Sequence, residues 1–309
     1  MGGALGISIA VETCFVDFNS KSGLSPIERK YLLSFLNDFE DGEWRHAAFD
    51  DFLWDNVAQT ALTQSERANA MLGDRSRLRE AAKNLRLIDN EPESSKGSEI
   101  AEIILYGLMR LHFDALPVVP KIFYKQNVKD YAKGADSVHI SIHGDNFRLY
   151  FGEAKFYTSI DNSRLESIVQ SIENSLATDK LKKENAIITS LRELDTLDLP
   201  DGMAERIRSA LSNRASIDDI KTLLHVPILL LHECSLTNGA TSKDQAYVDA
   251  IVEAHRERAS AYFERQIAKL SSRVLRYEDI TFHLVLLPVP SKKLIVERFL
   301  MEANVLKGS

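Results

Sequence analysis

Hydrophobic positions in the first part of the chain recur mainly at helical spacing. Residues 1–20 are moderately apolar and could contribute a strand. From Ser25 to about Leu87 the apolar period becomes that of a helix, and the pair Ser25–Pro26 is typical of a helix start. The positions with this period are Tyr31, Leu32, Phe35 and Leu36, followed by the stretches 49–62 and 76–88. The pattern therefore predicts a mainly helical N-terminal region over residues 1–90.

A polar stretch with proline and glycine, residues 89–97, separates this region from a second one. The second region opens with a helix over 98–113, with Ser98 as its expected N-cap and two glutamates near its start, where the helix dipole favours them. The expected strands are 118–126, the two strands of a hairpin at 136–155, 225–233 and 280–290. The expected helices are 162–178, 201–212, 216–225, 242–272 and 291–303. Asn162 or Ser163 is the expected N-cap of the first of these helices. This order predicts a mixed α/β fold over residues 96–309, with a central mixed sheet flanked by helices.

The hairpin has the most informative pattern in the chain. Gly144-Asp145 suits a two-residue turn, which would pair His143 with Asn146. The apolar pairs that follow from this register are Val138 with Phe151, Ile140 with Leu149, and Ile142 with Phe147. Because the alternation on both strands agrees with these pairs, the register is supported independently of the turn.

Three charged residues stand at the open end of the apolar face. The register places Asp136 opposite Glu153, with Cβ atoms about 4.5–5.5 Å apart, and Lys155 shares their face. Like charges at this distance repel, and burial adds to the cost. A divalent cation relieves both costs, and Mg²⁺ (or Mn²⁺) binds carboxylates while leaving positions for water and phosphate. The pattern predicts a metal site for phosphodiester hydrolysis, with Lys155 orienting or activating a water and stabilising negative charge.

The tripeptide Asp/Glu-x-Lys carries little information by itself. It occurs at Glu28–Lys30, Glu153–Lys155 and Asp219–Lys221. Only the second lies on an expected strand with an acid opposite. The alternative interpretation of this end of the hairpin is a simple salt bridge between Asp136 and Lys155, without chemistry.

The constellation resembles the PD-(D/E)xK nuclease superfamily, whose core runs helix, three strands, helix, strand. Asp136 matches the acid that opens one strand, and Glu153-Ala154-Lys155 matches the motif of the next. The resemblance implies that Asp136, Glu153 and the backbone carbonyl of Ala154 bind the metal ion. One departure is Ala135, which stands where the motif often has proline.

The superfamily often carries another acid on its first core helix. Glu99 matches this position best and Glu102 second. The alternative for Glu99 is a first-turn glutamate favoured only by the helix dipole.

Longer stretches are similar to the nuclease-subunit family of the Hachiman anti-phage defence system, HamA. They are KGSEIAEIILYGLM, LPVVPKIFYKQN, KGADSVHI and FGEAKFY. The resemblance implies a bacterial, cytoplasmic deoxyribonuclease that degrades DNA with little sequence preference beside a superfamily 2 helicase subunit. Residues 1–90 would then dock the partner or regulate the nuclease.

Composition narrows the classes of function. The chain has 309 residues, of which 44% are apolar and 27% charged, and no apolar run approaches the roughly 18 residues of a membrane helix. The N-terminus lacks the pattern of a signal peptide, and Cys14 and Cys234 suit two free thiols in a reducing compartment. The net charge is −7, and the basic clusters around Lys180–Lys183 and Arg256–Arg276 resemble solvated helix faces. Tight DNA binding is therefore expected to need a partner.

Two other functions fit the same residues. The chain could be a non-catalytic scaffold or inhibitor of a helicase, or a stand-alone restriction nuclease, although no recognition helix is visible. Gln170 is expected to be a solvated helix residue, and His232-Glu233-Cys234 to be a strand end and not a metal site. His139 and Tyr150 are expected to pack as a cross-strand pair on the face opposite the acids.

Overall fold

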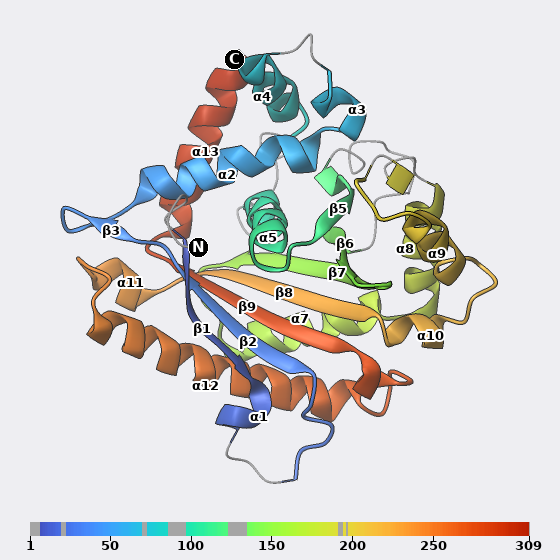
Figure 1. Cartoon of the computed structure of the whole chain (residues 1–309). Coiled ribbons are helices and arrows are strands. Elements are labelled where there is room, and N and C mark those ends of the chain that lie inside the picture. The colour runs from blue at the N-terminus through green and yellow to red at the C-terminus, as the bar shows by residue number, and fades with distance from the viewer. Residues whose placement is uncertain are drawn as a thin grey trace.

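A seven-stranded mixed sheet forms the centre of the molecule (Figure 1). The computed structural model describes residues 7–19, 23–69, 73–85, 97–122, 135–190, 194–195 and 197–308. The strands, in their order across the sheet, are β1 (Ser8–Cys14), β2 (Lys30–Leu36), β9 (Thr281–Val289), β8 (Leu224–Glu233), β7 (Asn146–Tyr157), β6 (Ser137–His143) and β5 (Leu116–Val119). The four inner strands from β2 to β7 are parallel, and the strands outside them are antiparallel to their neighbours.

Helices cover both faces of this sheet, which confirms the predicted mixed α/β class (Figure 1). One face carries α2 (His46–Ala61), α4 (Asp74–Lys83), α5 (Ser98–His112) and α13 (Lys292–Lys307). The other carries α7 (Asn162–Ser175), α8 (Thr178–Ser190) and α12 (Gln245–Leu270), with α9 (Met203–Ala210) and α10 (Ile217–Lys221) at one end. Shorter elements are α1 (Phe15–Phe18), β3 (Phe39–Glu40), β4 (Glu43–Trp44), α3 (Gln64–Arg67), α11 (Ser235–Gly239) and the turn η2 (Tyr277–Asp279).

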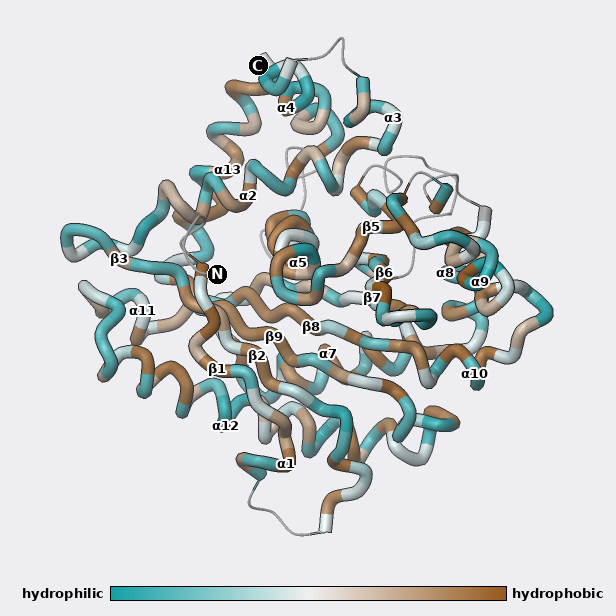
Figure 2. Tube along the Cα trace, in the orientation of Figure 1, coloured by the Kyte–Doolittle hydropathy of each residue, from teal (hydrophilic) through white to brown (hydrophobic). Residues whose placement is uncertain are grey.

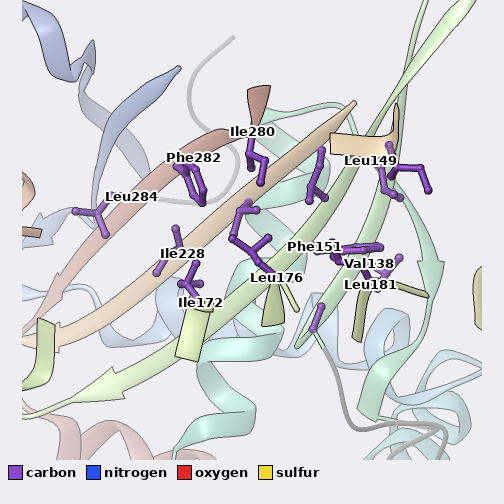
Figure 3. Close-up of a cluster of buried hydrophobic side chains, with 14 of the residues drawn as sticks. Val138, Leu149, Phe151, Ile172, Leu176, Leu181, Ile228, Ile280, Phe282 and Leu284 are labelled. Carbon is purple, nitrogen blue, oxygen red and sulfur yellow. The ribbon is translucent and has the colours of Figure 1, made fainter. Parts of the chain in front are cut away.

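The sheet divides the core into two main layers. Side chains on alternate strand positions face either the α7 and α12 layer or the α2, α5 and α13 layer. Figure 3 shows the first layer, where Phe151 of β7 and Ile228 of β8 lie with Ile172 of α7. The predicted inner strands β8 and β9 are apolar along most of their length (Figure 2), because both of their faces are buried.

One predicted helix in the N-terminal region is wrong. Residues 30–36 form β2, which pairs with β1 and β9, and Ser25–Pro26 starts no helix. Six of the seven residues of β2 are buried, and a short, nearly continuous apolar run fits a helix and an inner strand equally well. The predicted strand in residues 1–20 and the helix over 49–62 are confirmed by β1 and α2. The helix predicted over 76–88 corresponds to α4, which ends at Lys83; residues 86–88 lie outside the described residues.

Several boundaries of the second region also differ from the prediction. β5 ends at Val119, and residues 121–122 are helical, so the expected strand over 118–126 stops at Pro120; residues 123–126 lie outside the described residues. The expected helix over 162–178 ends at Ser175, and a separate helix, α8, includes the Lys180–Lys183 cluster, which was expected on a helix face without stated bounds. The boundary between residues 90 and 96 lies outside the described residues.

Two helices begin with a cap that lies one or two residues before the predicted cap. Ser98 is the first helical residue of α5, and Gly97 is the N-cap with φ of 99°. A Cβ on Gly97 would lie 2.8 Å from Phe156, so both the backbone conformation and the close packing require glycine here. Asp161, and not Asn162 or Ser163, caps α7 by accepting hydrogen bonds from two backbone amides.

Candidate active site

The β6–β7 hairpin has the predicted register. All three predicted apolar pairs and the pair His143–Asn146 are present, and Gly144-Asp145 forms the turn with Gly144 at φ of 57°. The ladder ends at Ser137 and Gly152. Asp136 and Glu153 therefore lie just beyond the last pair, where β6 has ended and β7 continues.

The three predicted charged side chains lie together at this point. The Nζ atom of Lys155 is 2.5 Å from Oε1 of Glu153 and 3.6 Å from Oδ2 of Asp136. The side chains of Glu153 and Asp136 are 9% and 15% exposed, whereas that of Lys155 is 31% exposed. The two acids are thus largely buried while the ammonium group is partly accessible to solvent.

Hydrogen bonds from neighbouring elements hold both acids in place. The backbone amide of Ala154 donates to Oδ2 of Asp136 (3.0 Å), and the amide of Asp136 donates to the carbonyl of Gly152 (2.8 Å). Ser171, on α7, donates its hydroxyl to Oε1 of Glu153 (2.6 Å). The sequence analysis missed Ser171, because a serine on a half-exposed helix carries no signal of its own.

Burial and mutual repulsion dominate the electrostatics of the acids. Burial, with the neighbouring charge of Asp136, raises the pKa of Glu153, although Lys155 and Ser171 work in the opposite direction. Burial by itself would lower the pKa of Lys155, but the two carboxylates outweigh it and the pKa is raised above its ordinary value. Lys155 is therefore a cation at any physiological pH.

The donors at this site suit a hard divalent cation. Asp136 and Glu153 supply carboxylate oxygens on one face of the hairpin. In a strand, the amide and the carbonyl of one residue point toward the same neighbouring strand. The amide and carbonyl of the next residue point toward the strand on the other side. The carbonyl of Ala154 thus points, like its amide, toward Asp136 and past the end of the ladder. Mg²⁺ commonly takes one or two carboxylates and completes its shell with water, so this donor set fits Mg²⁺ or Mn²⁺.

A model of the HamA family matches residues 12–303. The chain belongs to the HamA family. HamA is a component of the Hachiman anti-phage defence system, so membership confirms the resemblance of the longer motifs and implies a partner within a defence complex. No curated protein matches the chain in sequence. In the part of the chain that the structure describes, no helix has the length and apolar character needed to cross a membrane.

The acids on α5 belong to a helix that packs on the face of β7 opposite Glu153 and Lys155. Glu99 and Glu102 of this HamA family member are buried, on a helix that packs against Ala154 and Phe156. Ala154 and Phe156 alternate along β7 with Glu153 and Lys155. The helix α5 therefore covers the face of β7 opposite Glu153 and Lys155. Among the described residues, no group of three or more His, Cys, Asp or Glu side chains is arranged to hold a metal ion. Glu99 thus does not complete a three-acid cluster with Asp136 and Glu153, and its catalytic role stays a prediction.

Gly152 allows α5 to approach the hairpin closely at this point. A Cβ on this residue would lie 2.2 Å from the hydroxyl of Ser137 and 2.7 Å from Leu105 of α5. Any side chain here would push α5 or β6 away immediately before Glu153.

The remaining candidates have structural roles. His232 contacts His255, with 3.2 Å between their Nε2 atoms, and both are buried, so the strand-end interpretation holds; Cys234 is a free, half-buried thiol. His139 pairs with Tyr150 in the buried face, as predicted. Gln170 is exposed and donates hydrogen bonds to two α7 residues.

A buried ion pair supports the start of β6. Lys121 and Glu184 of α8 lie 2.7 Å apart, with side chains 2% and 3% exposed. The second carboxylate oxygen of Glu184 accepts a hydrogen bond from the amide of Ala135 (3.0 Å). Glu184 therefore positions the residue that precedes Asp136.

We expect Glu184→Ala to lower the free energy of unfolding by about 3–5 kcal/mol, because it leaves the Lys121 ammonium buried without its counter-ion. Urea denaturation measures this change. The double substitution Lys121→Met/Glu184→Leu should recover most of the loss, and Glu166→Ala, at an exposed site on α7, should change stability by less than about 0.5 kcal/mol. A loss below about 1 kcal/mol for Glu184→Ala would show that the pair does not support this end of the hairpin.

Proposed function

We propose that this protein is a metal-dependent deoxyribonuclease, the effector of an anti-phage defence complex that contains a superfamily 2 helicase. It hydrolyses phosphodiester bonds with little sequence preference in the bacterial cytoplasm. The observation that carries the proposal is the convergence of Asp136, Glu153 and Lys155 at the open end of the β6–β7 hairpin. The resemblance of these residues to the PD-(D/E)xK pattern supports the same reaction.

Each residue has a distinct role in this proposal. Asp136, Glu153 and the carbonyl of Ala154 would hold Mg²⁺ or Mn²⁺. When bound, such an ion supplies positive charge to phosphate oxygens and lowers the pKa of a bound water. Ser171 and the amide of Ala154 keep the two carboxylates oriented toward one another.

Lys155 acts through its charge. In the metal-free protein the two carboxylates raise the pKa of Lys155, so its side chain is a cation near neutral pH. It is the most exposed of the three side chains, so it can stabilise the negative charge that develops on the phosphate and orient the attacking water.

The negative net charge of the chain supports the proposal that DNA binding depends on a partner. A protein with net charge −7 repels DNA at long range. A helicase that opens and holds the DNA would supply most of the affinity, and the nuclease would then act on strands delivered to it.

The test is degradation of plasmid DNA by the chain co-purified with its partner, in Mg²⁺ and ATP. We expect a smear of products with Mg²⁺ and intact plasmid with EDTA. Discrete fragments would favour a restriction-type nuclease with its own recognition. Intact plasmid in Mg²⁺, together with an altered ATPase of the partner, would favour a scaffold or inhibitor and contradict the proposal.

A further inference from the structure

A groove of about 910 Å³ opens beside the candidate active site. Its walls are the C-terminal end of α7, the start of α8, α10 and the turn that follows α12, and we call it the α7–α10 groove. In Figure 1, α8 and α10 lie at the right-hand end of the sheet. The side chains that matter below are Gln170, Lys180, Lys182, Ser216, Lys221 and Arg273.

The inner end of the groove reaches the residues that surround Glu153. Lys180 and Leu176 line the groove and also a separate cavity of about 10 Å³, whose wall includes Glu153. Gln170 of the groove is the neighbour of Ser171, which holds the carboxylate of Glu153. A chain molecule lying in the groove would therefore pass close to the residues that surround Glu153.

Two of the four cations in the groove are occupied by structural contacts. Arg273 pairs with Glu173 of α7 (3.0 Å). Lys221 pairs with Asp218 (3.0 Å) and donates to the carbonyl of Leu275 (2.7 Å), which ties α10 to the turn after α12. These contacts build the walls and neutralise the acids of the groove.

Lys180 and Lys182 remain available. Both are exposed, and neither forms an ion pair or hydrogen bond with any described residue. Their spacing in the sequence is typical of a solvated helix face, but the fold makes this face one wall of a groove. The described lining of the groove therefore has an excess of two positive charges, in a chain whose net charge is −7.

The polar lining favours an extended anion and not a base-stacking ligand. Ser216 and Thr178 offer hydroxyl groups along the walls, and the Gln170 amide donates to Glu173 and Asn174. Among the described residues that line the groove none is aromatic, so these residues offer no stacking on bases, the main sequence-tolerant contact of single-strand binders. Contacts to phosphate need only cations and donors, and they carry no sequence information.

We propose that the α7–α10 groove binds the phosphate backbone of the nucleic acid strand that enters the candidate active site, with Lys180 and Lys182 as its phosphate contacts. This inference rests on the proposed nuclease function and names the path of its substrate. It also accounts for a nuclease with little sequence preference, because the bases of the strand would face away from the lysines.

The test compares two double variants of the full chain with equal changes in charge. Lys180→Glu/Lys182→Glu reverses the groove lysines. Lys83→Glu/Lys293→Glu reverses two exposed lysines of α4 and α13, on the other face of the sheet. Binding of a fluorescein-labelled DNA strand of mixed sequence is measured in EDTA over a range of salt concentrations. We expect the groove variant to bind at least tenfold more weakly than the control, with a slope of log K against log salt smaller by about 1.5.

Equal affinity and slope in the two variants would overturn the proposal. Lys180→Ala/Lys182→Ala should lose affinity to a smaller extent, and thermal denaturation of each variant checks that the fold is kept. The same loss on an RNA strand supports a groove that binds any phosphate backbone, and a loss confined to DNA supports one shaped for DNA.

A cleavage assay on the same proteins, each co-purified with the partner and supplied with Mg²⁺ and ATP, separates this proposal from the proposed function. If the wild type degrades DNA in Mg²⁺ and the groove variant does so equally fast, the groove proposal fails and the nuclease stands. If the wild type does not cut but the groove variant alone loses DNA binding, the nuclease fails and the groove stands.

Discussion

Lys155→Ala is expected to abolish metal-dependent degradation of DNA, with a loss of roughly 100- to 1,000-fold or more, as for removal of one group that stabilises transition-state charge. The reason is the position of the ammonium, which lies 2.5 Å from Glu153 and 3.6 Å from Asp136 and is partly open to solvent. The raised pKa keeps it charged throughout the neutral range. Plasmid degradation by the co-purified complex measures the effect, and size-exclusion chromatography confirms that the complex still assembles.

Lys30→Met is a matched control for this substitution. Lys30, on β2, belongs to the same tripeptide pattern and is buried, with its Nζ over the ring of Tyr277. It forms an ion pair with no acid among the described residues. We expect it to keep its cutting activity. Lys155→Arg should recover part of the activity, because it keeps the charge. Full activity in Lys155→Ala would mean that the three charges are structural and that another protein cuts the DNA.

Glu153→Gln is expected to stop DNA cleavage to a similar extent while making the metal-free protein at least as stable as the wild type near pH 7.5. Burial and Asp136 raise the pKa of Glu153 above its ordinary 4.5. The folded state therefore binds this proton more tightly than the unfolded state does. The stability due to Glu153 is fully present below about pH 4.5 and is lost as the pH rises through the raised pKa. Glutamine imitates the protonated form and removes this loss.

Thermal denaturation in EDTA between pH 5 and pH 8 checks the stability, and titration with Mg²⁺ checks the metal site. Wild-type Tm should rise with Mg²⁺, because a ligand that binds only the folded state stabilises it. Glu153→Gln should lose this rise, and Glu166→Gln, an exposed glutamate on α7, should keep it. The metal assignment would be contradicted if Glu153→Gln kept the full rise in Tm.

The candidate site was predictable because its parts are close in sequence. The register of β6 and β7 depends on a two-residue turn and on alternation within about twenty residues. Asp136, Glu153 and Lys155 follow from that register alone, and the structure places them together. The inner strands β8 and β9 were predictable for a similar reason, since a continuous apolar run identifies a strand buried on both faces.

Elements that depend on distant partners were not predictable. β2 becomes a strand because it pairs with β9, about 250 residues later in the chain, and its apolar spacing also fits a helix. The helix α8 has a mixed surface, and its burial depends on contacts with α7 and α10. Periodicity contains no information about such contacts.

The sequence by itself determined the mixed α/β class, the hairpin and the group of three charges, because short-range alternation and turn chemistry decide these features. Only the tertiary structure decided which residues support that group and how it meets the surface. Ser171 reaches Glu153 from α7, and Glu184 reaches Ala135 and Lys121 from α8. The α7–α10 groove likewise exists only where α7, α8, α10 and the turn after α12 pack together. These contacts join residues up to about a hundred positions apart, and they form only when the sheet brings its helices side by side.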